Sequence, residues 1–513
     1  MSFIDTILTE NPSATVVLVD RNSKPGGHWN HAYPYVKLHQ PSCYYGVNSL
    51  QLGKNRHPKS GLEIHDVDDR ATGAEVLAYY KTVCDNFVKT GRVRCFFDTE
   101  HTFDEATKRN QIVLNKFTGT KGKNRTNNTC YGKGVFYVNC QKLVTVATNV
   151  TVPSMRRKQP LIPLYDDEKA VSFVPPNDVP NCAKSGKYTH YIVFGNGKTG
   201  IDAVVNLVLE QGIDPSQITW ILGRDAWYYL RDAFRNYYKA LKLFGRMSSV
   251  NSVTECFLQH EADGLMGRLD PTILPKVFKG ALIGTKEFDT IRRLKNFVRM
   301  GRATAIHKHS IKLQHGSISF DPQTTLLVDC MVDNHYGYTF NENFTIFGAN
   351  RITLGPEISI YSPSFSSAII AFLECAVHET ADDGDNTTKN DYCFFLRGKQ
   401  HTLPHPETFL GAYYMDAKTF GAVWRVRGGK KFILHSRLFD AAPKHHEGGI
   451  RRMMWEWFGP NNLSEDGAKL VRKVGSYGYS DVNHKFGIES LEAEKWQRKR
   501  NRRRARWARR FGA

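Results

Sequence analysis

The chain has 513 residues, of which 41% are hydrophobic and 23% charged, and its formal net charge at pH 7 is +20. These values are typical of a globular protein of two or three domains and exclude a disordered or fibrous chain. No run of about eighteen apolar residues occurs, so no membrane-spanning helix is expected. The chain does not begin with a basic-then-apolar signal, and we expect an intracellular, cytoplasmic location.

The first elements that the sequence predicts are a helix over residues 1–10 and a buried strand over residues 14–19. Asp20 follows this strand, and an acid at the end of the second strand of a dinucleotide-binding unit binds the adenosine ribose. No strand and glycine loop precede the helix. We therefore expect the chain to begin inside such a unit, without its first strand and phosphate-binding loop.

Residues 65–150 predict a helix followed by short strands. Thr72-Gly73-Ala74-Glu75 is typical of a helix start, because the threonine and glutamate can cap the first backbone N–H groups. Strands are predicted over residues 93–97, 111–114 and 143–147. The polar, glycine-rich residues 118–133 predict a surface loop or insertion.

The most informative stretch is Tyr191 to Glu210, an apolar strand that ends in Gly195-Asn196-Gly197-Lys198-Thr199-Gly200 and continues as a helical pattern. This order is the dinucleotide-binding fingerprint. Gly195 permits the tight turn, Gly197 lets backbone approach a pyrophosphate, and Gly200 lets helix and strand pack closely. The N–H groups at the start of the helix, including those of Lys198 and Thr199, are then free to bind phosphate.

A second strand, predicted over residues 218–222, ends in Gly223-Arg224. An acid at this place suits a free ribose 2′-hydroxyl, whereas an arginine suits a 2′-phosphate. Arg224 therefore favours NADPH over NADH. Further strands are predicted over residues 321–329 and 344–347, and a helix over residues 363–375.

The ten cysteines are scattered and form no CxxC pair. This spacing argues against a disulfide framework, a zinc site and a dithiol redox pair, and it favours free thiols. Three histidine groups, at 307–309, 401–405 and 445–446, lack the arrangement of metal ligands. No metal site is predicted.

Residues 495–510 hold ten of the lysines and arginines, with Trp496 and Trp507 among them. Two interpretations stay open. This basic tail is either a solvated segment without a specific role or a surface that binds an anionic partner, such as nucleic acid or lipid.

The stretch Asp20-Arg21-Asn22-Ser23-Lys24-Pro25-Gly26-Gly27-His28-Trp29 resembles the acid-then-GGxW segment of two-dinucleotide-domain flavoproteins, among them the flavin-containing monooxygenases. Residues 33–50 resemble a group of FAD/NAD(P)-binding oxidoreductases within that superfamily. The resemblance covers about residues 1–415. It implies FAD and NADPH as cofactors, with Asp20, Arg21, Gly26, Gly27, Trp29, Gln40 and Ser42 near FAD, and with Gly195, Gly197, Lys198, Thr199, Gly200 and Arg224 near NADPH.

The resemblance also implies an α/β fold of two Rossmann-like dinucleotide-binding domains plus a C-terminal extension, with the FAD half interrupted by the NADPH half. The expected parts are residues 1–187 (FAD half), 188–310 (NADPH domain), 311–415 (returning FAD segment), 416–485 (extension) and 486–513 (basic tail). Residues 144–149 are similar to the VxATG strand end of the superfamily, with Asn149 in place of glycine.

The implied function is an NADPH-dependent FAD oxidoreductase acting on a small organic substrate, with monooxygenation as one form of that chemistry. The monooxygenase fingerprint FxGxxxHxxx(W/F) is not found between Thr151 and Tyr191, so the reaction type stays open. No catalytic residue is assigned. Two alternatives remain: a degenerate flavoprotein that binds nucleotide without turnover, and a basic-tailed binding protein on a nucleotide-fold scaffold.

Overall fold

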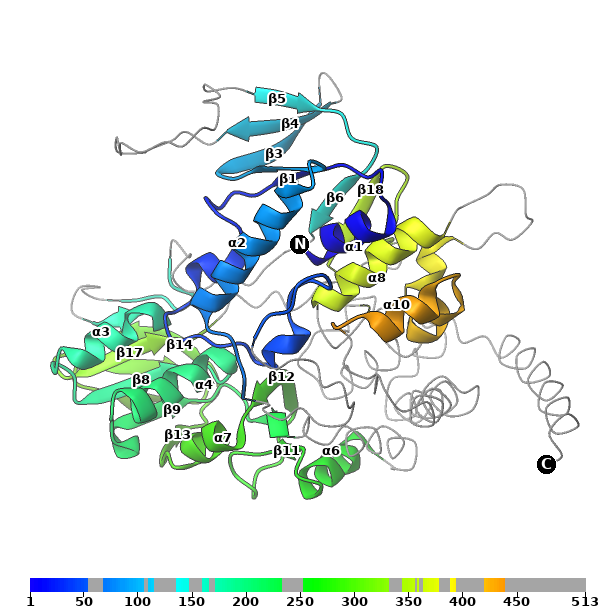
Figure 1. The fold of residues 1–513 in the computed structure, drawn as a ribbon. Coiled ribbons are helices and arrows are strands. Elements are labelled where there is room, and N and C mark those ends of the chain that lie inside the picture. Colours follow the sequence, from blue (N-terminus) through cyan, green and yellow to red (C-terminus); the bar gives the residue numbers. More distant parts are fainter. Residues whose placement is uncertain are drawn as a thin grey trace, which may run out of the picture.

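The computed structural model describes twelve stretches of the chain. Helices and strands are interspersed along the chain, and the largest sheet is parallel throughout, so the fold is mixed α/β (Figure 1). No helix in these stretches is both long and apolar enough to cross a bilayer. The described residues are 1–53, 68–105, 109–114, 135–146, 159–165, 171–232, 252–331, 344–355, 358, 363–377, 388–393 and 419–438.

The N-terminal elements form as the sequence predicts. Helix α1 spans Ser2–Glu10, and strand β1 (Val16–Val19) pairs in parallel with β2 (Val93–Phe96). Helix α2 (Gly73–Lys89) leads into β2 and begins with a complete capping box, in which Thr72 accepts from the Glu75 N–H and the Glu75 carboxylate accepts from the Thr72 N–H. Such a cap satisfies two N–H groups that the helix itself leaves without partners.

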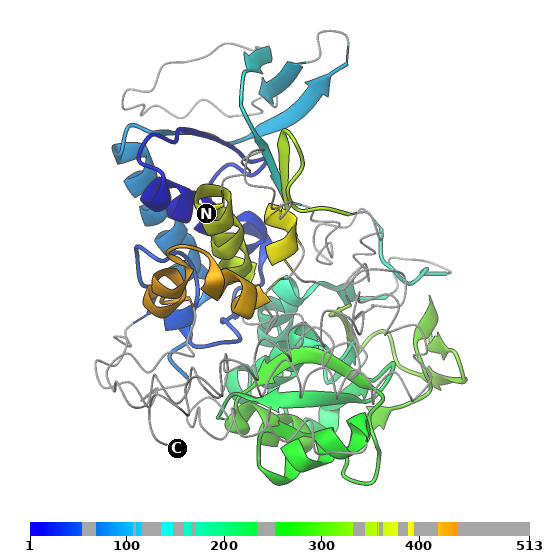
Figure 2. The same ribbon diagram turned by 90° about the vertical axis from the view of Figure 1, so that its right-hand side faces the viewer.

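The chain returns to this N-terminal region after residue 344. Helix α8 (Pro363–Ala376) lies beside α1, as both ribbon views show (Figures 1 and 2). Phe3 and Ile7 of α1 share one apolar core with α8 and with residues 419–438, which include helix α10 (Gly429–His435). The described part of the expected extension therefore belongs to the core that also holds the start of the chain.

A five-stranded sheet forms the second large part of the molecule. All its neighbouring strands are parallel, and the order is β13-β9-β8-β17-β7. In a dinucleotide-binding unit the glycine-bearing strand lies in the middle, and β8 occupies that place. The strands span Asn296–Val298 (β13), Ile218–Ile221 (β9), His190–Phe194 (β8), Thr325–Asp329 (β17) and Phe173–Val174 (β7).

Strand β17 corrects one expectation, because residues 321–329 were predicted to be part of the returning FAD segment. Thr325–Asp329 instead pairs with β8 along its whole length, from Thr325 opposite His190 to Asp329 opposite Phe194. All five residues of β17 are buried, which suits a strand inside a parallel sheet better than one at an edge.

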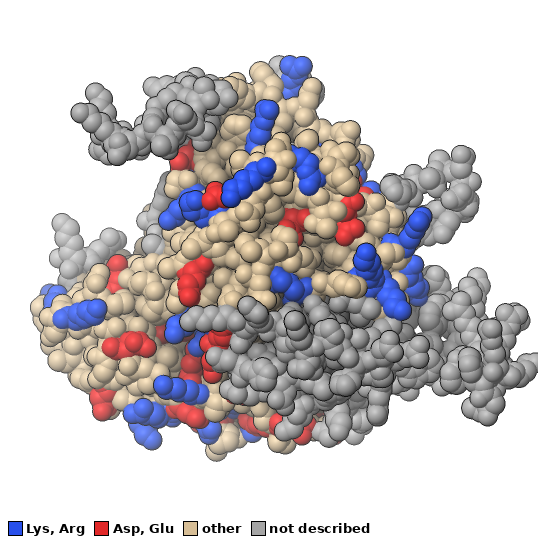
Figure 3. Space-filling model, viewed as in Figure 1, with Lys and Arg blue, Asp and Glu red and all other residues tan. Residues whose placement is uncertain are grey.

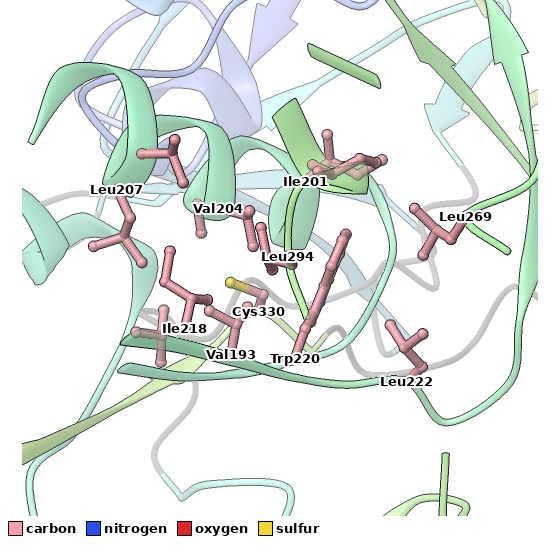
Figure 4. Close-up of a cluster of buried hydrophobic side chains, with 14 of the residues drawn as sticks. Val193, Ile201, Val204, Leu207, Ile218, Trp220, Leu222, Leu269, Leu294 and Cys330 are labelled. Carbon is pink, nitrogen blue, oxygen red and sulfur yellow. The ribbon is translucent and has the colours of Figure 1, made fainter. Parts of the chain in front are cut away.

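The core of this part lies between the sheet and helix α4 (Lys198–Val205), which continues as one π-helical turn over Asn206–Glu210. Figure 4 shows Val204 and Leu207 facing the sheet, with Val193, Ile218 and Trp220 among the strand residues beneath them. Burying this many apolar side chains completely, at about 1.5–3 kcal/mol each, fixes α4 against the sheet. Helices α3 (Val179–Lys184) and α7 (Thr285–Arg292) complete the unit.

Smaller sheets flank the two large parts. Residues 344–347 were predicted to be a strand, but the structure shows only an isolated bridge from Phe347 to Ile352. Residues 118–133, 147–149 and 486–513 lie outside the described residues. The remaining elements are β3 (Thr99–Asp104), β4 (Arg109–Leu114), β5 (Val135–Val138), β6 (Leu143–Val146), β18 (Arg351–Leu354), β10 (Ala226–Leu230), β11 (Met266–Gly267), β12 (Val277–Ile283), β14 (Ala303–His307), β15 (Ser310–Leu313), β16 (Gly316–Ser319) and α6 (Val253–Ala262).

Lysines and arginines alternate with acids over the described surface in Figure 3. The strong positive charge of the chain is therefore not gathered into one patch on the described part of this face.

Candidate dinucleotide-binding site

The turn between β8 and α4 gives each of its three glycines a separate structural task. Gly195 has a φ of +94°, which side-chain-bearing residues rarely adopt. A Cβ on Gly200 would lie 2.0 Å from the Gly195 carbonyl oxygen, so only glycine lets the helix approach the turn this closely. Gly197 caps α4, and a Cβ there would meet nothing within 4 Å. The space beside Gly197 is open.

Two side chains that sequence analysis missed hold this turn in place. The Trp220 Nε1–H donates to the Gly195 carbonyl at 2.9 Å, and the Asn196 Nδ2–H donates to the Arg224 carbonyl at 2.8 Å. Both bonds join the turn to β9 or the segment after it. A buried tryptophan on the neighbouring strand was a signal for the first bond, and an asparagine between two turn glycines was a signal for the second.

Lys198 and Thr199 form the first turn of α4. The Lys198 ammonium is buried and pairs with Asp202 one turn further along the helix, and it lies 3.9 Å from Glu287. Its side chain is thus held by protein carboxylates. Thr199 is half-buried. A ligand at the helix start would meet backbone N–H groups of these residues rather than the lysine charge.

Arg224 is exposed and follows β9, as predicted. Desolvation, and then the nearby positive charge of Arg302, lower the pKa of Arg224. Neither arginine forms an ion pair with any described residue, whereas Arg299 pairs with Asp225 at 3.1 Å. Two neighbouring cations without paired acids attract an anion.

Asp20 ends β1 and is half-buried. Its Oδ1 accepts from both the N–H and the side-chain amide of Asn22 at 2.8 Å, and the Asn22 oxygen contacts His31 at 2.8 Å. The Oδ2 of Asp20 accepts no hydrogen bond from the described residues. Asp20 therefore keeps one acceptor for a ligand hydroxyl. Arg21 beside it is exposed.

Gly26 and Gly27 both have positive φ, +124° and +55°. A Cβ on Gly26 would lie 2.4 Å from Leu77 of α2, whereas one on Gly27 would meet nothing within 4 Å. Trp29 is buried, and its indole N–H donates to the Tyr45 hydroxyl at 2.7 Å. The His28 ring lies 5.2 Å from the Trp29 ring. This segment packs against α2 and leaves Gly27 facing open space.

Gln40 and Ser42, expected near the cofactors, have protein partners. The Ser42 hydroxyl is completely buried and accepts from the Ala71 N–H at 2.6 Å. The Gln40 amide donates to the Tyr44 carbonyl at 3.4 Å. The contacts of Ser42 give it a structural role, and Gln40 is the more accessible of the two.

A cluster of charges joins the N-terminal part to the five-stranded part. Arg231, which is completely buried, donates to the His39 carbonyl at 2.8 Å and pairs with Glu287 at 2.9 Å and Asp68 at 2.7 Å. Arg70 pairs with Glu287 at 3.1 Å. We call Asp68, Arg70, Lys198, Asp202, Arg231 and Glu287 the junction cluster. Sequence analysis missed it, because its members are scattered over 220 positions of the chain.

Electrostatics within the junction cluster favour the charged state of Glu287. Burial alone raises the pKa of Glu287, but Lys198, Arg70 and Arg231 outweigh burial and lower this pKa to about 2. The Tyr33 hydroxyl, from the N-terminal part, donates to Asp202 at 2.6 Å. Desolvation, followed by the charges of Lys198 and Arg231, lowers the pKa of His39. His39 as a whole residue is exposed, and the lowered pKa favours its neutral imidazole.

The structure thus places the predicted residues in two groups. The residues from Asp20 to Ser42 lie with β1 and α2, and those from Gly195 to Arg224 lie on the five-stranded sheet. The junction cluster connects the two groups through Lys198.

No family model matches the chain. Among solved structures it resembles the OTEMO complex with FAD and NADP, with a TM-score of 0.44, 15% identity and coverage of 73% of this chain and 81% of that one. It also resembles the open form of cyclohexanone monooxygenase, with a TM-score of 0.40, 14% identity and coverage of 72% and 85%.

Proteins of known sequence give a nearer relationship. Uncharacterized protein Rv2000 of Mycobacterium tuberculosis and Uncharacterized protein Mb2023 of Mycobacterium bovis are each 32% identical to this chain over 424 residues. The match covers 80% of this chain and 69% of each relative. The chain therefore belongs to the family of these uncharacterised mycobacterial proteins.

Proposed function

We propose that the protein is an NADPH-dependent FAD flavoprotein oxidoreductase that acts on a small organic substrate. The observation that carries this proposal is the turn at residues 195–200. Its three glycines have the tight turn, the open space and the close helix contact that a pyrophosphate-binding loop needs.

The residues at this turn fit a bound NADPH. The N–H groups at the start of α4 follow Gly197, where a Cβ would meet no atom within 4 Å, and they would hold the pyrophosphate. Arg224, with Arg302 next to it, would bind the 2′-phosphate and so select NADPH over NADH.

The N-terminal group fits the adenosine part of FAD. The unpaired Oδ2 of Asp20 would accept from a ribose hydroxyl, and Gly26, Gly27 and Trp29 would form the wall of that site. Arg21 and Gln40 would line it, while Ser42 would support the loop. Flavin, when bound, accepts a hydride from the nicotinamide and passes electrons to a substrate. The junction cluster would hold the two groups at a fixed distance during this transfer.

The first test is the visible absorbance spectrum of the desalted full chain, followed by anaerobic addition of NADPH. We expect flavin bands that bleach on addition of NADPH. A colourless protein that takes up no added FAD would overturn the flavin part of the proposal. A flavin spectrum that does not respond to NADPH would favour a nucleotide-binding protein without turnover.

A matched pair of variants tests the turn itself. Gly197→Ala adds a methyl group to the open space where the pyrophosphate would lie, and no protein atom lies within 4 Å of it. We expect a loss of stability below about 1 kcal/mol, because alanine caps a helix less well than glycine, and an unchanged flavin spectrum. NADPH affinity should be at least about 10-fold weaker, equivalent to about 1.4 kcal/mol. Gly421→Ala is the control, because a Cβ there also meets no atom within 4 Å, and it should change neither the flavin spectrum nor the NADPH affinity. Equal NADPH binding by both variants would contradict the assignment.

A further inference from the structure

Cys84 and Cys95 lie with their sulfur atoms 3.3 Å apart. This contact corrects the expectation that the cysteine spacing excludes a dithiol pair, since the fold brings together two thiols eleven positions apart. Cys84 and Cys95 are both free thiols.

The local fold explains why the two sulfurs face each other. On α2, Val83, Cys84 and Phe87 are buried and form the face toward β2. On β2, side chains alternate, so Cys95 points to the same side as the buried Val93. The helix ends at Lys89, and a short turn at Thr90 and Gly91 sends the strand back along it.

We propose that Cys84 and Cys95 form a reversible disulfide under peroxide oxidation, which makes this corner a redox-sensitive modification site. This inference does not depend on the proposed function. The sulfur–sulfur bond of a disulfide is about 2 Å, so closure requires a movement of little more than 1 Å, within reach of side-chain rotation.

The chemistry balances with hydrogen peroxide as the oxidant. The thiolate of the pair attacks one peroxide oxygen, the O–O bond breaks, hydroxide leaves, and a sulfenic acid forms. The second sulfur then attacks the sulfenic sulfur, the S–O bond breaks, and water leaves with the thiol proton as the disulfide closes. The two thiols lose two electrons, and the peroxide gains them.

Charge and exposure are divided between the two sulfurs. The hydrogen bond from Cys95 lowers the pKa of Cys84, against the effect of burial, and the same bond raises the pKa of Cys95. Of the two sulfurs, Cys84 therefore forms the thiolate more readily, and Cys95 is the one that keeps its proton. Cys95 is partly exposed, so a small oxidant reaches the pair at Cys95, whereas Cys84, whose pKa is lowered, is buried.

Peptide mapping of the full chain tests the proposal. The protein is treated with hydrogen peroxide, its remaining thiols are alkylated, and it is digested with trypsin without reduction. Lys89, Arg92 and Arg94 separate the two cysteines. We therefore expect one linked species made of peptides 82–89 and 95–108, which dithiothreitol returns to two free peptides.

The contrary result is equally clear. If both peptides stay separately alkylated while the exposed Cys140 is oxidised, the proposal is wrong. Cys84→Ser and Cys95→Ser should each abolish the linked species, and Cys182→Ser, a thiol without a cysteine neighbour among the described residues, should leave it intact. If a serine variant does not fold, the map of the unmodified chain still decides the question.

Discussion

Two strands of this molecule, each in a different parallel sheet, are followed by charged residues of opposite sign. Asp20 follows β1, and Arg224 follows β9. At β9 the preceding glycine turn is complete, with Trp220 and Asn196 bonded to it. At β1 the positive-φ glycines lie after the strand instead, where Gly26 packs on Leu77 of α2.

This difference shows that the two groups would recognise nucleotide by different means. The β8–α4 turn has backbone N–H groups beside an open space, whereas the β1 region has a carboxylate oxygen and, in the segment after it, the buried Trp29. A negative strand end suits a ribose with free hydroxyls, and a positive one suits a ribose that carries phosphate. Four substitutions would break or sharpen this comparison.

The largest effect is expected from Gly200→Ala. The new Cβ would lie 2.0 Å from the Gly195 carbonyl, and backbone must move to accommodate it. We expect unfolding free energy to fall by more than about 3 kcal/mol and NADPH binding to disappear. Urea unfolding and NADPH titration measure the two effects. Normal stability would mean that the turn is looser than the structure shows.

Glu287→Gln would weaken the connection between the two groups. It removes one of the two carboxylates that pair with the completely buried Arg231, the one at 2.9 Å, and Asp68 remains. We expect a loss of about 3 kcal/mol in the free energy of unfolding. Urea unfolding at pH 7 measures this loss.

The same residue predicts a pH dependence. The pKa of Glu287 falls from 4.5 to about 2 on folding, so its contribution to stability is complete above about pH 4.5 and is lost as the pH falls toward 2. The difference in stability between the unmodified chain and Glu287→Gln should therefore shrink from pH 5 to pH 2. A constant difference across that range would contradict the electrostatic role.

Arg224→Gln sharpens the contrast between the two strand ends. It removes the charge beside the proposed 2′-phosphate, so KM for NADPH should rise about 10-fold, or about 1.4 kcal/mol. KM for NADH should stay the same, because NADH has no phosphate there. Steady-state kinetics with both coenzymes measures these KM values. Arg299→Gln is the control, because Arg299 is a cation that already pairs with Asp225. Equal losses for both coenzymes would rule out a 2′-phosphate contact.

The smallest effect is expected from Trp29→Phe. This change removes the hydrogen bond to the Tyr45 hydroxyl at 2.7 Å, while Tyr45 keeps its bond to Tyr80. We expect a loss of about 1 kcal/mol in urea unfolding and little change in NADPH affinity. A strong effect on NADPH affinity would place this segment near the nicotinamide coenzyme, against the proposed division of roles.

Local patterns predicted the elements that depend on neighbouring residues. The capping box at Thr72 and Glu75 and the strand–turn–helix at Gly195 to Gly200 are both confirmed, because short-range geometry determines them. The helix over 363–375 is also present as α8. The roles of the predicted cofactor residues stay predictions.

Long-range pairing set the limits of the sequence analysis. Strand β17 is as apolar as a strand of either part, so its sequence does not say which sheet it joins. The junction cluster and the Cys84–Cys95 contact depend on how separate elements pack. The sequence shows Lys198 and Asp202 four positions apart, which is the spacing of an ion pair on a helix, but it does not show that this pair is buried.

The loop of the proposed flavin region needs a partner, Arg437, that is made late in synthesis. The buried guanidinium of Arg437 donates to the carbonyls of Cys43 and Tyr45, at 2.6 and 2.7 Å, from 392 to 394 positions further along the chain. A ribosome adds about 5–20 residues per second, so this loop waits roughly 20–80 s for its last partner. During that interval the nascent loop exposes carbonyls and apolar rings that a chaperone can bind, and a chain released before residue 437 would keep them exposed.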